Sequence, residues 1–109
     1  GLLSNNEKLA EEIRQAAKTA GEHVWPLPLH ADYKERLKSK VADVANIANK
    51  AGAGTIIGGL FLEEFVDSKP WAHLDIAGVA WAESEKPYIP KGASGFGVRL
   101  LTTLLENWR

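Results

Sequence analysis

The stretch "PWAHLDIAG" at residues 70–78 is the segment on which the expected fold depends, because it is apolar apart from two side chains. Together with the "VA" that follows, it predicts a β-strand over residues 71–80. His73 and Asp75 lie two positions apart, so on a strand they point to the same face. This pair is compatible with a metal site, a catalytic pair or a structural polar pair whose hydrogen bonds are satisfied.

A second apolar segment, "VADVANIA" at residues 41–48, predicts another strand. Both segments are apolar on both faces, which is typical of central strands covered by helices on each side. Two such strands make only a marginal sheet, so further strands are expected from a partner chain or from a longer polypeptide. The predicted class is therefore α/β, with part of a mixed β-sheet flanked by helices.

Four helices are expected around these strands. The first follows "SNNE", where Ser4 and Glu7 have the spacing of a capping box, and it ends before Gly21. The others are expected over 31–40, after the glycine-rich turn of "AGAGTIIGGLFLEEFV" (51–66), and over 97–108. The expected buried positions are, by helix, Leu9, Ile13, Ala16, Ala17 and Ala20; Tyr33 and Leu37; Ile56, Leu60, Phe61 and Phe65; and Val98, Leu101, Leu105 and Trp108.

Composition restricts the classes of function. The 109 residues carry 13 basic and 14 acidic side chains, so the net charge of −1 gives no support to a nucleic-acid or membrane-surface partner. Cysteine is absent, which excludes disulfides, zinc fingers and thiol catalysis. No apolar run reaches the ~18 residues of a membrane span. No signal peptide is expected from the first residues, and Gly1 need not be a native start.

Several motifs suggest chemistry, and each also has a structural interpretation. Gly52, Gly54, Gly58 and Gly59 lie between a predicted strand and a helix, but they match neither the dinucleotide fingerprint nor the phosphate loop. Close packing of a helix on the sheet is the favoured interpretation.

The remaining candidate residues are weaker. His73 and Asp75, with Asp43 on the other strand, could supply metal ligands, although buried hydrogen bonding explains the pair more simply. Ser94 lies outside any nucleophile elbow. "KPYIPKG" (86–92) is interpreted as a solvated loop, and Trp25, Trp71, Trp81 and Trp108 as core or interface residues.

Seven words of the sequence resemble the C-terminal portion of the cytosolic leucyl aminopeptidase family, in the order and spacing of that family. They are "GLLSNNEKLAEEI", "GEHVWPLPL", "DYKERLKS", "VADVANI", "AGAGTIIGGLFLEEFV", "PWAHLDIAG" and "KPYIPKGASGFGVRLL". The resemblance covers essentially all of residues 1–109, which it implies to be the C-terminal segment of an incomplete catalytic domain.

The resemblance implies an enzyme with two divalent metal ions, zinc or manganese, that activate water and polarise the scissile carbonyl. The family's metal ligands and catalytic arginine lie in motifs that precede the segment matched by "GLLSNN", and this chain contains neither motif. We therefore expect no catalytic residue and no metal ligand here, and no metal bound by the segment alone. His73 and Asp75 are then expected to be structural.

The resemblance also implies a substrate pocket. Residues matching Ala77, Gly78, Val79 and Ala80 help to line the pocket for the N-terminal side chain of the substrate. The small Ala77 and Ala80 leave an apolar space suited to leucine-like side chains. At the position of Phe96, many members carry another residue, often arginine.

The expected function is accordingly that of a metal-dependent aminopeptidase in the full-length parent, with the isolated segment inactive. The implied partners are a peptide substrate, the rest of the catalytic domain and the other subunits of a cytoplasmic homo-hexamer, with no membrane. A non-catalytic scaffold module of the same fold and a DNA-associated role are the alternatives, and the near-neutral charge gives the second no support.

Overall fold

A computed structural model describes residues 1–108 of the chain. Within that range the elements are β1 (Leu2–Ser4), α1 (Glu7–Ala20), the 3-10 helix η1 (Ala31–Leu37), α2 (Gly54–Glu63), β2 (Ala72–Leu74), β3 (Trp81–Ala82), β4 (Gly92–Ala93) and α3 (Val98–Glu106). The predicted α/β class is confirmed, since helices surround short strands.

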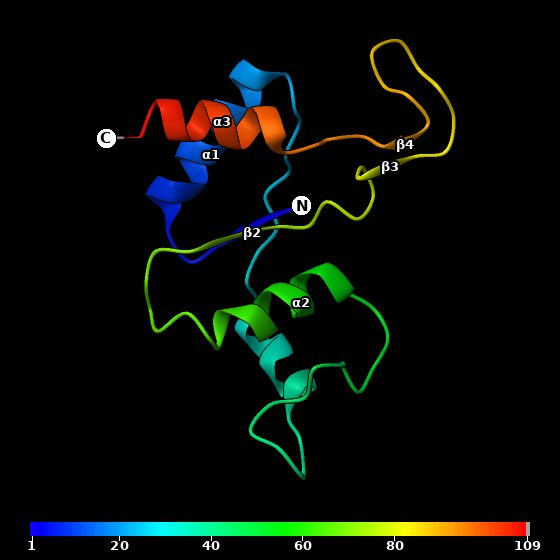
Figure 1. Ribbon diagram of the computed structural model, residues 1–109. Helices are drawn as coiled ribbons and strands as arrows, with labels where there is room; N and C mark the ends of the chain where they lie inside the picture. The colour runs from blue at the N-terminus through cyan, green and yellow to red at the C-terminus, as the bar shows by residue number, and fades with distance from the viewer. Residues whose placement is uncertain (109) are drawn as a thin grey trace.

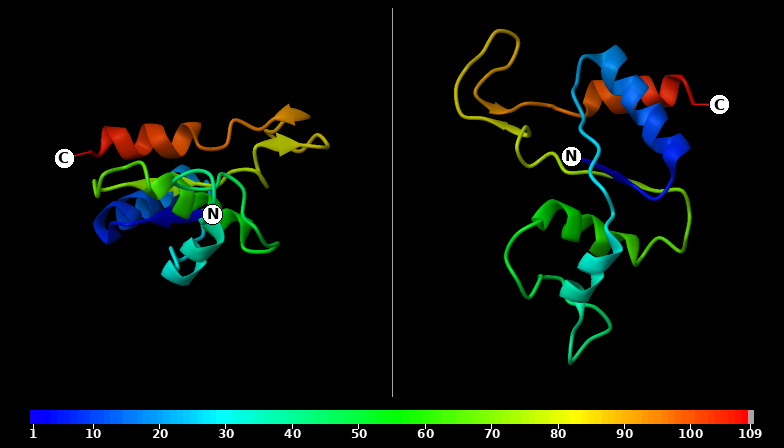
Figure 2. Two further views of the ribbon diagram at one scale, coloured as in Figure 1. Left: turned by 90° about the horizontal axis from the view of Figure 1, so that it is seen from below. Right: turned by 180° about the vertical axis from the view of Figure 1, so that it is seen from behind.

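A narrow ribbon of β1 and β2 lies at the centre of the molecule. The two strands are antiparallel, with Leu3 opposite His73. On its other side β1 forms a parallel bridge with Pro26, in the segment that follows α1. Figure 1 shows α1 and α3 on one side of the ribbon and α2 with η1 on the other. The molecule is flat, with extents of 48 × 37 × 18 Å, as the first view of Figure 2 illustrates.

Two hydrophobic clusters correspond to the two sides of the ribbon. Leu2 packs with Ile13, Ala17 and Leu100, which joins β1 to α1 and α3. The second cluster is formed by Leu37, Ile57 and Leu60, which joins η1 to α2. Leu3 is fully buried and faces α2, because a Cβ added at Gly59 would lie 2.9 Å from its Cδ2 atom.

The first helix forms as predicted, but it begins differently. Asn6, not Ser4, is the N-cap, and its side chain accepts the backbone N–H of Leu9 at 2.8 Å. Ser4 belongs to β1 instead, where its hydroxyl donates to the carbonyl of Trp71 at 2.6 Å. The hydroxyl is therefore used to tie β1 to the segment entering β2. Gly21 ends the helix with a left-handed φ of 68°, as expected.

The predicted strand over residues 41–48 is wrong. That segment is a series of bends, in which Val41 is 97% exposed. The hydroxyl of Ser39 accepts the backbone N–H groups of Val41 and Ala42, at 3.2 and 3.1 Å. A side chain that pairs with nearby backbone donors offers the chain an alternative to a strand ladder. Asp43 therefore lies on an exposed loop and not beside β2.

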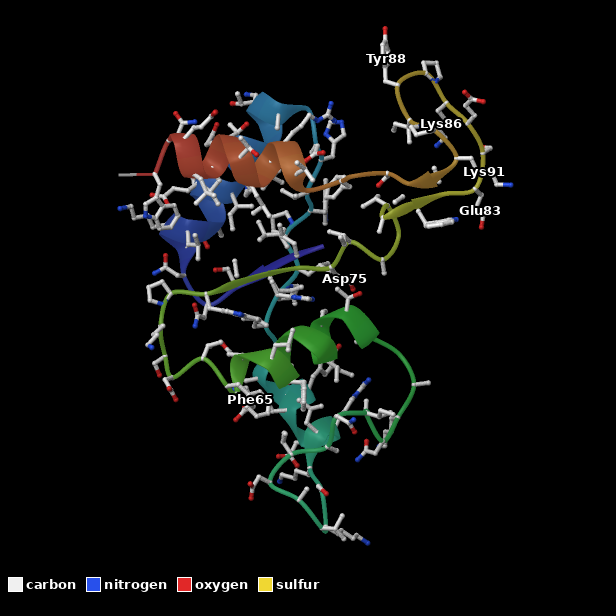
Figure 3. The ribbon with its side chains drawn as sticks, in the orientation of Figure 1. Phe65, Asp75, Glu83, Lys86, Tyr88 and Lys91 are labelled. Carbon is white, nitrogen blue, oxygen red and sulfur yellow. The ribbon has the colours of Figure 1, made fainter. Side chains whose placement is uncertain are left out.

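The strand predicted over residues 71–80 is shorter than expected, because only Ala72–Leu74 pair with β1. Asp75 ends it, since its carboxylate accepts the backbone N–H of Ala77 at 3.0 Å and turns the chain. Beyond this turn, β3 and β4 form a small hairpin, and the predicted solvated loop at 86–92 connects these two strands. The hairpin extends away from the three layers, with Tyr88 near its tip (Figure 3).

The buried face of α3 also differs from the prediction. Leu100 is fully buried and Leu104 is half-buried, whereas the predicted residues are exposed: Val98, Leu101, Leu105 and Trp108. Phe65 is exposed as well, although Leu60 is buried as predicted. Trp25 and Trp81, like Trp108, are not core residues, since all three are more than half exposed.

Candidate functional site

A cavity of about 290 Å³ lies at the end of β2, where the ribbon meets α2 and the segment after α1. Its lining is mostly apolar and comes from four parts of the chain: the start of β1, residues 23–27, Thr55 of α2 and the turn after β2. Phe96, just before α3, completes the lining. The cavity therefore depends on segments that are distant in the sequence.

Asp75 is the acidic residue of this lining, and both of its carboxylate oxygens accept hydrogen bonds within the chain. One carboxylate oxygen accepts the hydroxyl of Thr55 at 2.6 Å, and the other accepts the backbone N–H of Ala77. These two hydrogen bonds, in that order of effect, lower the pKa of the Asp75 carboxyl below its ordinary value. Figure 3 shows Asp75 between the end of β2 and the start of α2.

His73 does not join Asp75 in a polar pair. Its ring stacks on that of Trp71, with centroids 6.2 Å apart and planes 8° from parallel. Its backbone lies in the middle of the pairing with β1. The hydrogen-bonding interpretation therefore describes Asp75, which forms a turn, whereas His73 is held by ring stacking and not by the polar pairing that was expected.

The other candidate motifs have structural partners. Gly59 brings α2 against Leu3, as the close-packing interpretation requires. The hydroxyl of Ser94 donates to the carbonyl of Val79 at 2.6 Å and accepts the N–H of Phe96 at 3.2 Å. Lys86 and Tyr88 lie on the exposed β3–β4 hairpin (Figure 3). Among residues 1–108, no group of three or more histidine, cysteine or acidic side chains is arranged to hold a metal ion.

The residues predicted to line a substrate pocket are mostly brought together. Ala77, Gly78 and Val79 line the cavity, whereas Ala80 lies just beyond it and accepts the N–H of Ser94 through its carbonyl at 2.9 Å. Gly78 and Val79 also line a second, larger cavity of about 740 Å³ beside the hairpin. Which part of this lining a substrate contacts stays a prediction.

Sequence reasoning missed one residue beside these cavities. Glu22 lines the larger cavity, and it is buried although it is charged. It accepts hydrogen bonds from residues that lie 75 and 78 positions away, so no local pattern could have indicated its role.

None of the helices within residues 1–108 has the length and apolar character that crossing a bilayer requires.

Comparison with known proteins gives a consistent result along the chain. Residues 1–102 match the catalytic domain of the cytosol aminopeptidase family. A probable cytosol aminopeptidase of Solibacter usitatus is 47% identical over 109 residues, which are 100% of this chain and 22% of that protein. A protein of the same name from Chlorobaculum tepidum is 55% identical, over 99% of this chain and 21% of its own length.

Proposed function

The chain belongs to the cytosol aminopeptidase family, and we propose that it is the C-terminal part of a metal-dependent aminopeptidase that removes N-terminal residues from peptides. The observation that carries this proposal is the match over residues 1–102, at about half identity to relatives that bear that name. The chain spans about a fifth of the length of these relatives, so most of the enzyme's residues lie in the remainder.

The contribution of this chain is to shape the pocket for the N-terminal side chain of the substrate. Ala77, Gly78 and Val79 are small or medium-sized, and they line an apolar cavity of about 290 Å³. An apolar pocket with few polar groups favours leucine-like side chains over charged ones. Asp75 and Thr55 are hydrogen-bonded to each other, which holds these two polar groups of the lining together.

The two metal ions of the proposed enzyme do not fit the residues present here. Within residues 1–108 there is no cluster of three potential ligands, and a catalytic metal site needs at least that number. Zinc or manganese would be held by the remainder of the polypeptide, where it would activate water for peptide hydrolysis. The segment alone is therefore proposed to be inactive.

The proposed setting is the cytoplasm, in agreement with the names of the relatives, and the proposed assembly is a homo-hexamer. The exposed apolar side chains of α3 and the hairpin are compatible with contacts to the rest of the catalytic domain or to other subunits. The net charge of −1 gives a DNA-associated role no support.

The test begins with the intact mass of the polypeptide that carries this sequence in its native source, followed by its hydrolysis of leucine p-nitroanilide. We expect a mass several times the 11.9 kDa of these residues, and activity that EDTA removes and manganese or zinc restores. Residues 1–109 alone serve as the matched control and are expected to be inactive. A mass near 11.9 kDa without hydrolysis would favour the scaffold alternative.

A further inference from the structure

Glu22 is a charged side chain in a place where charged side chains are rarely found. It is 5% exposed and is the one charged residue among residues 1–108 that is classed as buried. Its Oε2 atom accepts the backbone N–H groups of Gly97 and Leu100, both at 3.0 Å. Its Oε1 atom lies 3.5 Å from Nε of the exposed Arg99.

These contacts supply the start of α3 with the acceptor that its own sequence lacks. The N-cap is Gly97, which has no side chain to accept the free N–H groups of the first turn. A carboxylate in this position pairs with the free donors and with the positive end of the helix dipole. Glu22, the second residue after the end of α1, therefore fixes where α3 begins.

Phe96 lies directly before Gly97, the N-cap of α3, and Ser94 holds the chain on the other side of Phe96. Ser94 accepts the N–H of Phe96 and donates to the carbonyl of Val79, so residue 94 ties the segment to the cavity lining. Gly95 and Gly97, which flank Phe96, have φ values of 69° and 96°, a region that side-chain-bearing residues rarely adopt. The backbone at Phe96 is thus held from both sides.

The two cavities meet at this held segment. Phe96 lines both of them, together with Val79, Gly78 and His23. His23 follows Glu22 in the chain. The same short segment therefore contributes His23 to the lining and, through Glu22, the hydrogen bond to Gly97 beside Phe96.

We propose that Glu22 is a positioning residue for side-chain selectivity: by fixing the start of α3, it holds Phe96 where the aromatic ring limits the size of the cavity. This proposal rests on the proposed aminopeptidase function. Glu22 is not a catalytic residue in this account, because it acts on the substrate only through Phe96.

The test uses the full-length polypeptide with Glu22→Ala, Glu22→Gln and, as the matched control, Glu12→Ala. Glu12 lies within α1, where its side chain is 38% exposed and forms an ion pair with Lys8. Hydrolysis of leucine, alanine and phenylalanine p-nitroanilides is measured as kcat and KM separately. Glu22→Ala is expected to lower the preference for leucine over alanine by roughly fivefold to tenfold, mainly through KM.

Glu22→Gln keeps an oxygen for the two N–H groups and loses the charge, so it should show a smaller change in the same direction. It also decides the question if Glu22→Ala does not fold. Preference ratios that equal those of the wild type and Glu12→Ala would overturn the proposal. An equal fall of kcat for all three substrates would also overturn it, since that result indicates a purely structural role.

Amide hydrogen exchange separates failure of this proposal from failure of the proposed function. Faster exchange at Gly97 and Leu100 in Glu22→Gln than in Glu12→Ala is expected whether or not the polypeptide is a peptidase. Unchanged exchange at both amides would overturn the claim that Glu22 fixes the start of α3. A wild-type polypeptide that hydrolyses no anilide would instead overturn the aminopeptidase function, and with it the selectivity role.

Discussion

The two sides of the β1–β2 ribbon are stabilised in different ways, although two consecutive residues of β1 pack on them. Leu2 and Leu3 are 1% and 0% exposed, and they point to opposite faces because side chains alternate along a strand. Leu2 contacts α1 and α3 through a cluster of bulky side chains. Leu3 faces α2, where the opposing residue is Gly59.

This difference shows that one side depends on the volume of its side chains and the other on close approach of a backbone. On the Leu2 side, removal of atoms should be the damaging change. On the Leu3 side, addition of a single methyl group should be damaging, because Gly59 leaves no room for it. The following predictions test this contrast.

The largest effect is expected from Leu100→Ala. Leu100 is fully buried against Leu2, Ile13 and Ala17, so truncation removes buried apolar surface and leaves a cavity between α1 and α3. Such substitutions cost about 2–5 kcal/mol in the free energy of unfolding. Urea denaturation of the chain, followed by circular dichroism, measures the change.

Leu105→Ala is the matched control, because it makes the same chemical change in the same helix. Leu105 is 70% exposed, so its truncation should change the free energy of unfolding by less than about 0.5 kcal/mol. Equal losses for the two variants would contradict the burial of α3 described above and would indicate that its other face is covered.

A smaller loss of stability is expected from Gly59→Ala, which adds atoms to the core instead of removing them. The added Cβ would lie 2.9 Å from Leu3 Cδ2, so the side chain of Leu3, which is fully buried, would have to shift among its neighbours. Gly58→Ala, in the same helix, adds a methyl group with nothing within 4 Å. We expect Gly59→Ala to destabilise by about 1–3 kcal/mol and Gly58→Ala to stabilise by up to about 1 kcal/mol.

Thermal denaturation of both variants beside the wild type measures this difference. The helix propensity gained is the same at both positions, so the gap between them isolates the contact with Leu3. Two variants of equal stability would show that the ribbon and α2 can separate without cost, and the close-packing interpretation of the glycine-rich segment would be wrong.

The sequence predicts the two helices on the Leu2 side of the ribbon unequally. In α1 the apolar residues occupy one face and charges the others, so Ile13 and Ala17 were correctly expected to be buried. In α3 leucines occupy two adjacent faces, and the position of α1 decides which face is buried. Helical spacing within α3 carries no information about that position. Tertiary contact selected Leu100 and Leu104, and the prediction chose the other face.

The same limit applies to the strands and the site. The apolar run at 41–48 has the composition of a strand, but pairing needs a neighbour, and local hydrogen bonds to Ser39 prevail. Ala77, Gly78 and Val79, which the family resemblance assigned to a substrate pocket, line a cavity, and their contact with a substrate stays a prediction. Glu22 has no local signal, because its partners start at Gly97.

The smallest predicted effect concerns the hydrogen bond that joins α2 to the end of β2. Thr55→Val removes the donor to Asp75, and this should cost about 1 kcal/mol at pH 6, a typical value for one hydrogen bond. Thr102→Val is the matched control, since its hydroxyl only bonds to the carbonyl of Val98 within the exposed surface of α3. The control should change stability by less than the Thr55 variant.

The pH dependence of this loss gives a second measurement. The pKa of Asp75 is lowered in the folded chain, chiefly by Thr55, so the unfolded chain binds the proton more readily. The stabilisation is therefore complete above the ordinary pKa of 3.8 and disappears as the pH falls through the lowered folded value. Wild type and Thr55→Val should thus differ most at pH 6 and converge toward pH 2 in urea denaturation. A difference that stays constant over this range would mean that the hydroxyl does not act on the carboxylate, and that α2 is held to the ribbon by Gly59 and its contact with Leu3 alone.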